Sequence, residues 1–276
     1  MKSKAFLLTV CACAALAFVL SQLPQPAEAN HSWGGYHWAR TSNPFTLKVV
    51  DSNTSNWDTS RGTAMTDWSQ STVLNVVLDP TGADDSTRAR KQCRMVAGKI
   101  RSCNAAYGFN GWLGIATINI SGGVHITQAT VKMNDSYLNS SSYTQTNRQH
   151  VMCQEMGHDF GLDHQDESGA DLNTCMDYSN ALDNPHPNQH DYDELQIIYG
   201  HNDSSTTIAA LTFFDNQFGD DPDAPHNWGQ LVSQSANGRS STYEHENING
   251  TKTVRHVFWA QEAADRCGAC DHRYDR

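Results

Sequence analysis

The chain has 276 residues, a formal net charge of −11 and eight cysteines, and only 38% of its residues are hydrophobic. The acidic balance argues against a nucleic-acid-binding function, which needs a basic face. This composition is typical of a secreted, loop-rich protein.

The N-terminus has the pattern of a secretory signal. Lys2 and Lys4 precede an apolar run from Ala5 to Leu20, and the triplet 27–29 reads Ala-Glu-Ala. We therefore predict a signal peptide at residues 1–29; the alternative is a retained N-terminal anchor. The run is short for a membrane span. We expect a secreted, extracellular protein that is monomeric and has no membrane attachment after cleavage.

Export would place the remaining cysteines in an oxidising compartment. They are Cys93, Cys103, Cys153, Cys175, Cys267 and Cys270. Six cysteines allow fifteen pairings. Proximity favours Cys93–Cys103 and Cys267–Cys270, which leaves Cys153–Cys175. The alternative for the Cys267–Cys270 pair is a redox or metal site.

Alternation of apolar and polar residues, together with turn residues, predicts the first elements. We expect strands at 44–50, 73–78, 111–118 and 124–133, and a helix at 58–71. The last of these strands is expected near a sheet edge. The basic stretch at 88–101 carries no clear pattern.

Two more helices are expected, at 146–160 and at 189–199, where Gly200 provides a stop. The composition changes from His201 onward. A linker is expected at 219–225, for which a calcium loop is the alternative. Segments 241–246 and 251–259, joined around Asn249-Gly250, predict a β-hairpin. The extension at 201–276 is short for an independent core, so we expect it to pack on the preceding domain.

Residues 154–164 read Gln-Glu-Met-Gly-His-Asp-Phe-Gly-Leu-Asp-His. On a helix, Gln154 and His158 share one face, with Glu155 beside them. Gly161 can adopt the left-handed conformation that ends a helix, so the chain can turn and bring His164 to the same point. A catalytic zinc uses three protein ligands, and a nearby carboxylate can deprotonate a water molecule.

This stretch resembles the long zinc signature of the metzincin metalloproteases, with Gln154 in place of the first histidine. Thr174-Cys175-Met176-Asp177-Tyr178 resembles the Met-turn of that family. The resemblance covers about residues 40–200. It implies an α+β fold: a twisted mixed sheet with an active-site helix and a C-terminal helix. It places the catalytic domain at 30–200.

By this resemblance, the chain is a zinc-dependent endopeptidase that cleaves a protein or peptide substrate with a water molecule activated by Glu155. One catalytic Zn²⁺ would be held by His158, His164 and Gln154. Tyr178 would stabilise the oxyanion, and Met176 would be structural. Residues 114–116 would lie on the edge strand that pairs with the bound peptide. A structural Ca²⁺ has no support beyond the loop at 219–225.

Gln154 leaves three alternatives open. In the first, the side-chain oxygen of Gln154 binds zinc weakly. In the second, another residue is the third zinc ligand, and in the third, the fold is kept but proteolytic activity is lost. His150 lies two helical turns from His158, about 12 Å along the axis, which is too far for one tetrahedral ion. In the third case the protein would be a non-catalytic, peptide- or zinc-binding relative of the family.

The other histidines show no zinc spacing and are assigned to core or surface. They include His31, His37, His186, His190, His226, His245 and His256. The chain also lacks the cysteine-switch motif of latent metzincins. Either there is no latent form, or the C-terminal tail or a short N-terminal arm covers the cleft.

Overall fold

The computed structural model describes residues 31–165, 169–177, 179, 181–208, 224–268 and 270–274. The predicted signal peptide, Tyr178 and most of the predicted linker at 219–225 lie outside these ranges. Within them, each helix is either too short or too polar to cross a bilayer.

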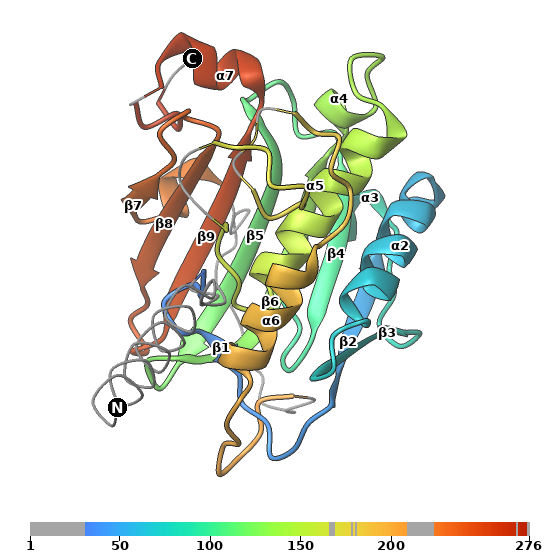
Figure 1. The fold of residues 1–276 in the computed structure, drawn as a ribbon. Helices are drawn as coiled ribbons and strands as arrows, with labels where there is room; N and C mark the ends of the chain where they lie inside the picture. Colours follow the sequence, from blue (N-terminus) through green and yellow to red (C-terminus); the bar gives the residue numbers. More distant parts are fainter. Residues whose placement is uncertain are drawn as a thin grey trace, which may run out of the picture.

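The described strands form one nine-stranded sheet (Figure 1). Eight of them run in the order β3-β2-β4-β6-β5-β9-β8-β7, and β1 pairs with β6. Their bounds are β1 His37–Trp38, β2 Phe45–Ser52, β3 Leu74–Asp79, β4 Ile100–Ala105, β5 Trp112–Ser121, β6 His125–Asn134, β7 Gln230–Gln234, β8 Ser240–Glu246 and β9 Lys252–Trp259. Pairing is parallel from β3 to β6, and antiparallel from β6 through β5 and β9 to β7. The sheet is therefore mixed, which is consistent with the expected α+β class.

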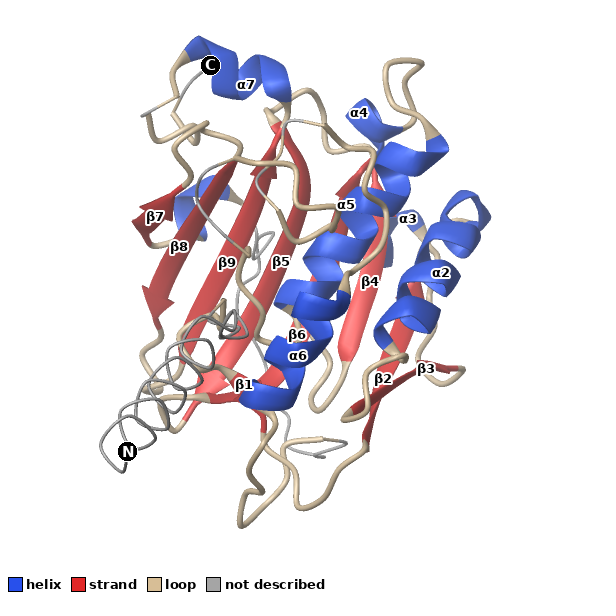
Figure 2. Ribbon diagram, in the orientation of Figure 1, coloured by secondary structure: helices blue, strands red, loops and turns tan. Residues whose placement is uncertain are grey.

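The described helices are short. Their bounds are η1 Ser55–Trp57, α2 Asp58–Trp68, α3 Thr87–Gln92, α4 Asp135–Leu138, α5 Gln145–His158, α6 Gln189–Ile198, η2 Pro225–Asn227 and α7 Gln261–Arg266. α2 and α5 lie side by side across one face of the sheet (Figure 2). Trp68 at the end of α2 donates from its indole Nε1 to the Cys153 carbonyl oxygen at 3.1 Å. This contact joins the two helices within the main apolar core.

The C-terminal strands continue the sheet that the earlier strands begin. β9 pairs with β5, and a second apolar cluster packs side chains of the two strands together. The cluster consists of Trp112, Ile115, Trp228, Tyr243, Val257, Trp259 and Ala263. Since Trp112 and Ile115 belong to β5, the extension is packed directly against the preceding part of the chain.

The structure corrects two expectations about the sheet. The strand expected near an edge, β6, lies in the interior between β4 and β5. Residues 114–116 are not on an edge either, because β9 pairs with them. The unassigned basic stretch contains α3 and leads into the interior strand β4.

All three expected disulfides are present. Cys93 bonds to Cys103, Cys153 to Cys175, and Cys267 to Cys270. The second of these links α5 to the loop that carries Met176.

Candidate metal centre

Both ends of α5 follow from its sequence. Thr144 begins the helix with a capping box, which satisfies backbone N–H groups of the first turn. The helix ends at His158, and Gly161 follows with φ of 92°. A Cβ atom at Gly161 would lie 1.9 Å from the Tyr36 carbonyl oxygen, so only glycine fits there. The turn brings the rings of His158 and His164 to 4.7 Å between centroids.

Three buried imidazoles meet beside this turn: His158, His164 and His256, which we call the buried histidine centre. One ring nitrogen of each lies within 4.8 Å of the others. The rings of His158 and His256 are 3.9 Å apart, and the residues are 1–5% exposed. Tetrahedral zinc with bonds of about 2.0–2.1 Å separates its ligand atoms by about 3.3 Å. The three side chains would have to close in slightly around an ion.

The protonation state of His158 suits a metal ligand. Its Nδ1 lies 2.8 Å from the Leu162 carbonyl oxygen, which can only accept, so Nδ1 carries the proton. Its Nε2 is buried and has no hydrogen-bond partner. Burial, and then the neighbouring His256 and His164, lower the pKa of His158 well below its usual range. The ring is therefore neutral at ordinary pH, with a lone pair directed away from its carbonyl partner.

Glu155 lies against the same centre. Its Oε2 is 3.0 Å from Nδ1 of His256, whose Nε2 is 2.6 Å from the Ser240 hydroxyl. Burial raises the pKa of Glu155 well above its usual range and lowers that of His256 to about 3. A protonated Glu155 can donate to His256, and His256 can then donate to Ser240. In this form the carboxyl group is engaged and cannot act as a base.

Gln154 faces the Met-turn segment. Its amide nitrogen donates to the carbonyl oxygens of Cys175, at 2.9 Å, and Asp177, at 3.3 Å. Its side-chain oxygen is buried without a hydrogen-bond partner. The amide is thus anchored through its nitrogen, and its oxygen is left available for another partner.

The Met-turn packs directly under α5. A Cβ atom at Gly157 would lie 2.5 Å from the Met176 sulfur and 2.8 Å from the Trp68 ring. Glycine at this position therefore lets Met176 and the helix approach each other. Tyr178, expected to stabilise the oxyanion, lies outside the described residues.

His150 lies outside the buried histidine centre. Its Nδ1 is 2.8 Å from the Asn184 carbonyl oxygen, and its ring stacks on Phe258 at 6.0 Å. It is thus a buried, hydrogen-bonded side chain.

β9 occupies the position where the resemblance would place a bound peptide. It runs antiparallel to β5, with His256 opposite Ala116. A Cβ atom at Gly114 would lie 2.7 Å from the Val151 side chain and 2.8 Å from Glu155. Glycine therefore lets β5 lie close to α5, and the paired strand β9 carries His256 to Glu155.

His256 was assigned to core or surface from the sequence, and it is buried; what the sequence did not indicate is that it belongs to the buried histidine centre. No local spacing could have revealed this, because strand pairing brings His256 to the motif from a distant part of the chain. The one local signal is a polar residue within the apolar strand 252–259. The described residues contain two further groups with metal-ligating side chains: His31 with His190 and Asp191, and His37 with His125 and Asp203.

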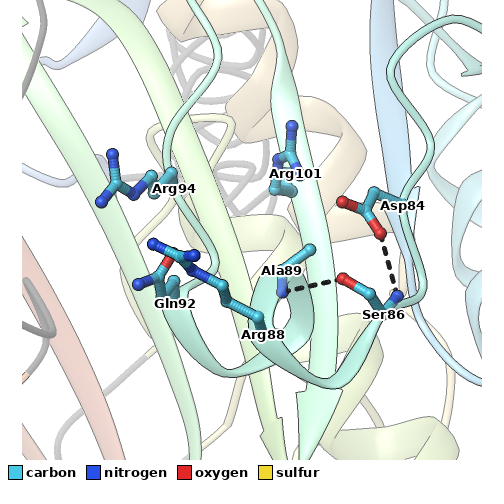
Figure 3. A pocket seen from close by; sticks show the side chains of 7 residues that line it. All are labelled: Asp84, Ser86, Arg88, Ala89, Gln92, Arg94 and Arg101. Carbon is cyan, nitrogen blue, oxygen red and sulfur yellow. Dashed lines mark hydrogen bonds between the residues drawn. The ribbon is translucent and has the colours of Figure 1, made fainter.

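A separate pocket lies beside α3 (Figure 3). It is lined by Asp84, Ser86, Arg88, Ala89, Gln92, Arg94 and Arg101. Its lining includes no residue of the histidine groups, so it is not part of the candidate metal centre.

A scan against protein-family models and a search of curated proteins found no match for this chain.

Proposed function

We propose that the chain is a zinc-dependent endopeptidase whose resting form is closed by its own strand β9. The observation that carries the proposal is the buried, unpartnered Nε2 of His158, which lies among neutral imidazoles next to Glu155. A buried ring nitrogen without a partner is costly unless a ligand satisfies it. Imidazole nitrogen is a preferred zinc ligand, so the donor set fits this ion.

His158 and His164 would hold the ion, and Glu155 would accept the proton of the attacking water molecule. Zinc, when bound, supplies Lewis acidity and lowers the pKa of water. Tyr178 would donate a hydrogen bond to the developing oxyanion, a role that rests on the resemblance to metzincins. Met176, beneath Gly157, would support the floor of the centre.

Two contacts make this form a closed one. Glu155 is bonded to His256, and the edge of β5 that would bind a peptide is already paired with β9. A substrate could pair with β5 only after β9 had left. His256 would leave with it, so the third ligand of the open form would be the unpartnered side-chain oxygen of Gln154.

A second candidate is a non-catalytic zinc-binding protein in which His256 is a permanent third ligand. The observation that favours it is the burial of β9, whose residues from Thr253 to Trp259 are all buried. Such a strand is strongly anchored, because Val257 and Trp259 also belong to the second apolar cluster.

Zinc content and casein cleavage distinguish the two candidates. We expect wild type to bind zinc and to cleave slowly, and His256→Ala to keep zinc and cleave about two- to tenfold faster, since a hydrogen bond between uncharged groups contributes about 0.5–1.5 kcal/mol. Glu155→Gln should keep zinc and lose cleavage. His245→Ala, in the partner strand β8, is the matched control. If His256→Ala loses zinc and stays inactive, the second candidate holds; if wild type binds no zinc at this centre, both fail.

The three disulfides are typical of a protein that matures in an oxidising compartment. They support the proposal that the enzyme is secreted. We further propose that it acts outside the cell as a monomer on a protein or peptide substrate.

A further inference from the structure

β1 lies at one end of the sheet (Figure 1). Four side chains from three separate segments lie close together around it: His37, His125, His201 and Asp203, which we call the outer histidine cluster. β1 pairs with β6 so that His37 lies opposite His125. His201 and Asp203 follow α6. The cluster shares no residue with the buried histidine centre.

Four of the six separations between the donor atoms are close to those of a tetrahedral site. Oδ1 of Asp203 lies 3.5, 3.2 and 3.6 Å from the Nε2 atoms of His37, His125 and His201. The Nε2 atoms of His37 and His201 are 3.2 Å apart. Zinc bonds of about 2.0–2.1 Å give tetrahedral edges of about 3.3–3.4 Å. The donors of His37, His125 and Asp203 all lie within 4.8 Å of one another, and His201 would have to move closer to His125 to complete the set.

Neighbouring groups orient these donors as they do in metal sites. Nδ1 of His37 lies 2.9 Å from the Gly35 carbonyl oxygen, so it carries the proton and leaves a lone pair on Nε2 of the neutral ring. The other oxygen of Asp203, Oδ2, accepts from the Arg40 backbone N–H at 3.1 Å and from its guanidinium at 2.9 Å. Such outer hydrogen bonds fix the orientation of metal ligands.

Nε2 of His37 faces two of the other proposed ligands. It lies 3.5 Å from Oδ1 of Asp203 and 3.2 Å from Nε2 of His201, which can donate a hydrogen bond to it when no ion is bound. An ion among these atoms would instead accept their lone pairs, together with that of His125.

We propose that His37, His125, His201 and Asp203 bind a second zinc ion in a closed, structural site. Three imidazoles and one carboxylate fill four tetrahedral positions, and a site with four protein ligands leaves no open position for a substrate. The ion would tie β1 and the segment after α6 to the start of β6. This inference does not depend on the proposed peptidase activity.

The test is the zinc content of the purified full-length chain and its variants, measured after dialysis against zinc-free buffer. His201→Ala and Asp203→Asn should each lose about one zinc per chain relative to wild type. His226→Ala, an exposed histidine outside the three histidine groups, should lose none. His158→Ala should keep the outer ion, so the double variant with His201→Ala should lose both. Chelation should lower the Tm of wild type more than that of His201→Ala.

The His201 side chain is 52% exposed, so its removal leaves a folded protein that can be tested even if the Asp203 variant unfolds. Equal zinc content in wild type, His201→Ala and His125→Ala would overturn the proposal. In that case the cluster is a hydrogen-bonded network around Asp203. If the His190→Ala variant lost one zinc ion instead, the second ion would belong to the group around His31. This result would also overturn the proposal.

Discussion

The buried histidine centre and the outer histidine cluster differ in what their side chains are already bonded to. In the outer cluster, the carboxylate of Asp203 lies 3.2–3.6 Å from three imidazole nitrogens and is itself one of the proposed ligands. In the buried centre, His256 is bonded to the carboxyl group of Glu155, the proposed base. A set of four protein ligands suits a structural ion. A centre in which one imidazole occupies the proposed base suits a site that changes its partners.

The two sites also depend on different parts of the fold. The buried centre needs the turn at Gly161, the Met-turn and β9, whereas the outer cluster needs β1 and the segment after α6. Substitutions that disturb one set of contacts should therefore affect the zinc of the other site less.

The largest effect is expected at Gly161. Gly161→Ala places a Cβ 1.9 Å from a backbone oxygen in a left-handed conformation, so the turn must open and His164 must move. We expect the free energy of unfolding to fall by about 3 kcal/mol or more, and zinc to be lost from the buried centre. Because the added Cβ also presses on the peptide that precedes His37, zinc binding at the outer cluster should weaken to a smaller extent. Urea denaturation and zinc content measure both effects.

Gly35→Ala is the matched control, because Gly35 has φ of 73° but a Cβ atom there would meet nothing within 4 Å. It should cost only the conformational penalty of about 1–2 kcal/mol. Equal losses in the two variants would show that the clash with Tyr36 is not what fixes the turn.

Removal of the Cys153–Cys175 disulfide should have the next largest effect. The bond spans 22 residues, so its loss should lower the free energy of unfolding by about 3 kcal/mol through the unfolded state. It should also loosen the contact between α5 and the Met-turn, and weaken zinc binding at the buried centre. The Cys267–Cys270 pair, three residues apart, is the control and should have a smaller effect on both.

A smaller effect is expected where Met176 meets α5. Gly157→Ala should lower the free energy of unfolding by about 1–3 kcal/mol, because the added methyl group overpacks against Met176 and Trp68. Gly62→Ala in α2, where a Cβ meets nothing within 4 Å, should instead raise it by about 0.5–1 kcal/mol. Stabilisation by both substitutions would show that Met176 does not press on the helix.

The smallest effect concerns pH and a site that belongs to neither metal centre. Lys99 lies 2.6 Å from the buried carboxylate of Asp79, and this hydrogen bond lowers the pKa of Asp79. A carboxyl group whose pKa is lower in the folded than in the unfolded state stabilises the folded protein at any pH above the unfolded-state pKa. This stabilisation is lost as the pH falls through the folded-state pKa. Asp79→Asn should therefore be less stable than wild type at pH 7, and the difference should shrink in acid.

Zinc content should be unchanged in Asp79→Asn. A difference in stability that stayed constant from pH 7 down to strongly acidic pH would contradict the assigned cause.

Local patterns predicted the parts of the fold that local contacts determine. The expected helix at 146–160 is α5 at 145–158, and the expected hairpin corresponds to β8 and β9. β4 was missed because it is an interior strand with buried polar residues. Ser102 and Asn104 contact Asn53 and Thr54 there, so no alternation marks the strand.

The candidate sites also divide into residues that local patterns bring together and residues that contacts between distant segments bring together. The motif brought Glu155, His158 and His164 together because a helix and a glycine turn suffice to do so. His256 and the outer histidine cluster depend on strand pairing between distant segments, which no local spacing encodes. The missing cysteine switch left the C-terminal tail as one possible cover of the cleft, but no local pattern indicated that β9 would pair with β5.

The most direct test of this account is anomalous X-ray scattering at the zinc absorption edge from crystals of the full-length chain. We predict one anomalous peak within bonding distance of His158 and His164, and a second among His37, His125, His201 and Asp203. The absence of a peak at His158 from zinc-saturated crystals would contradict the proposed metal centre.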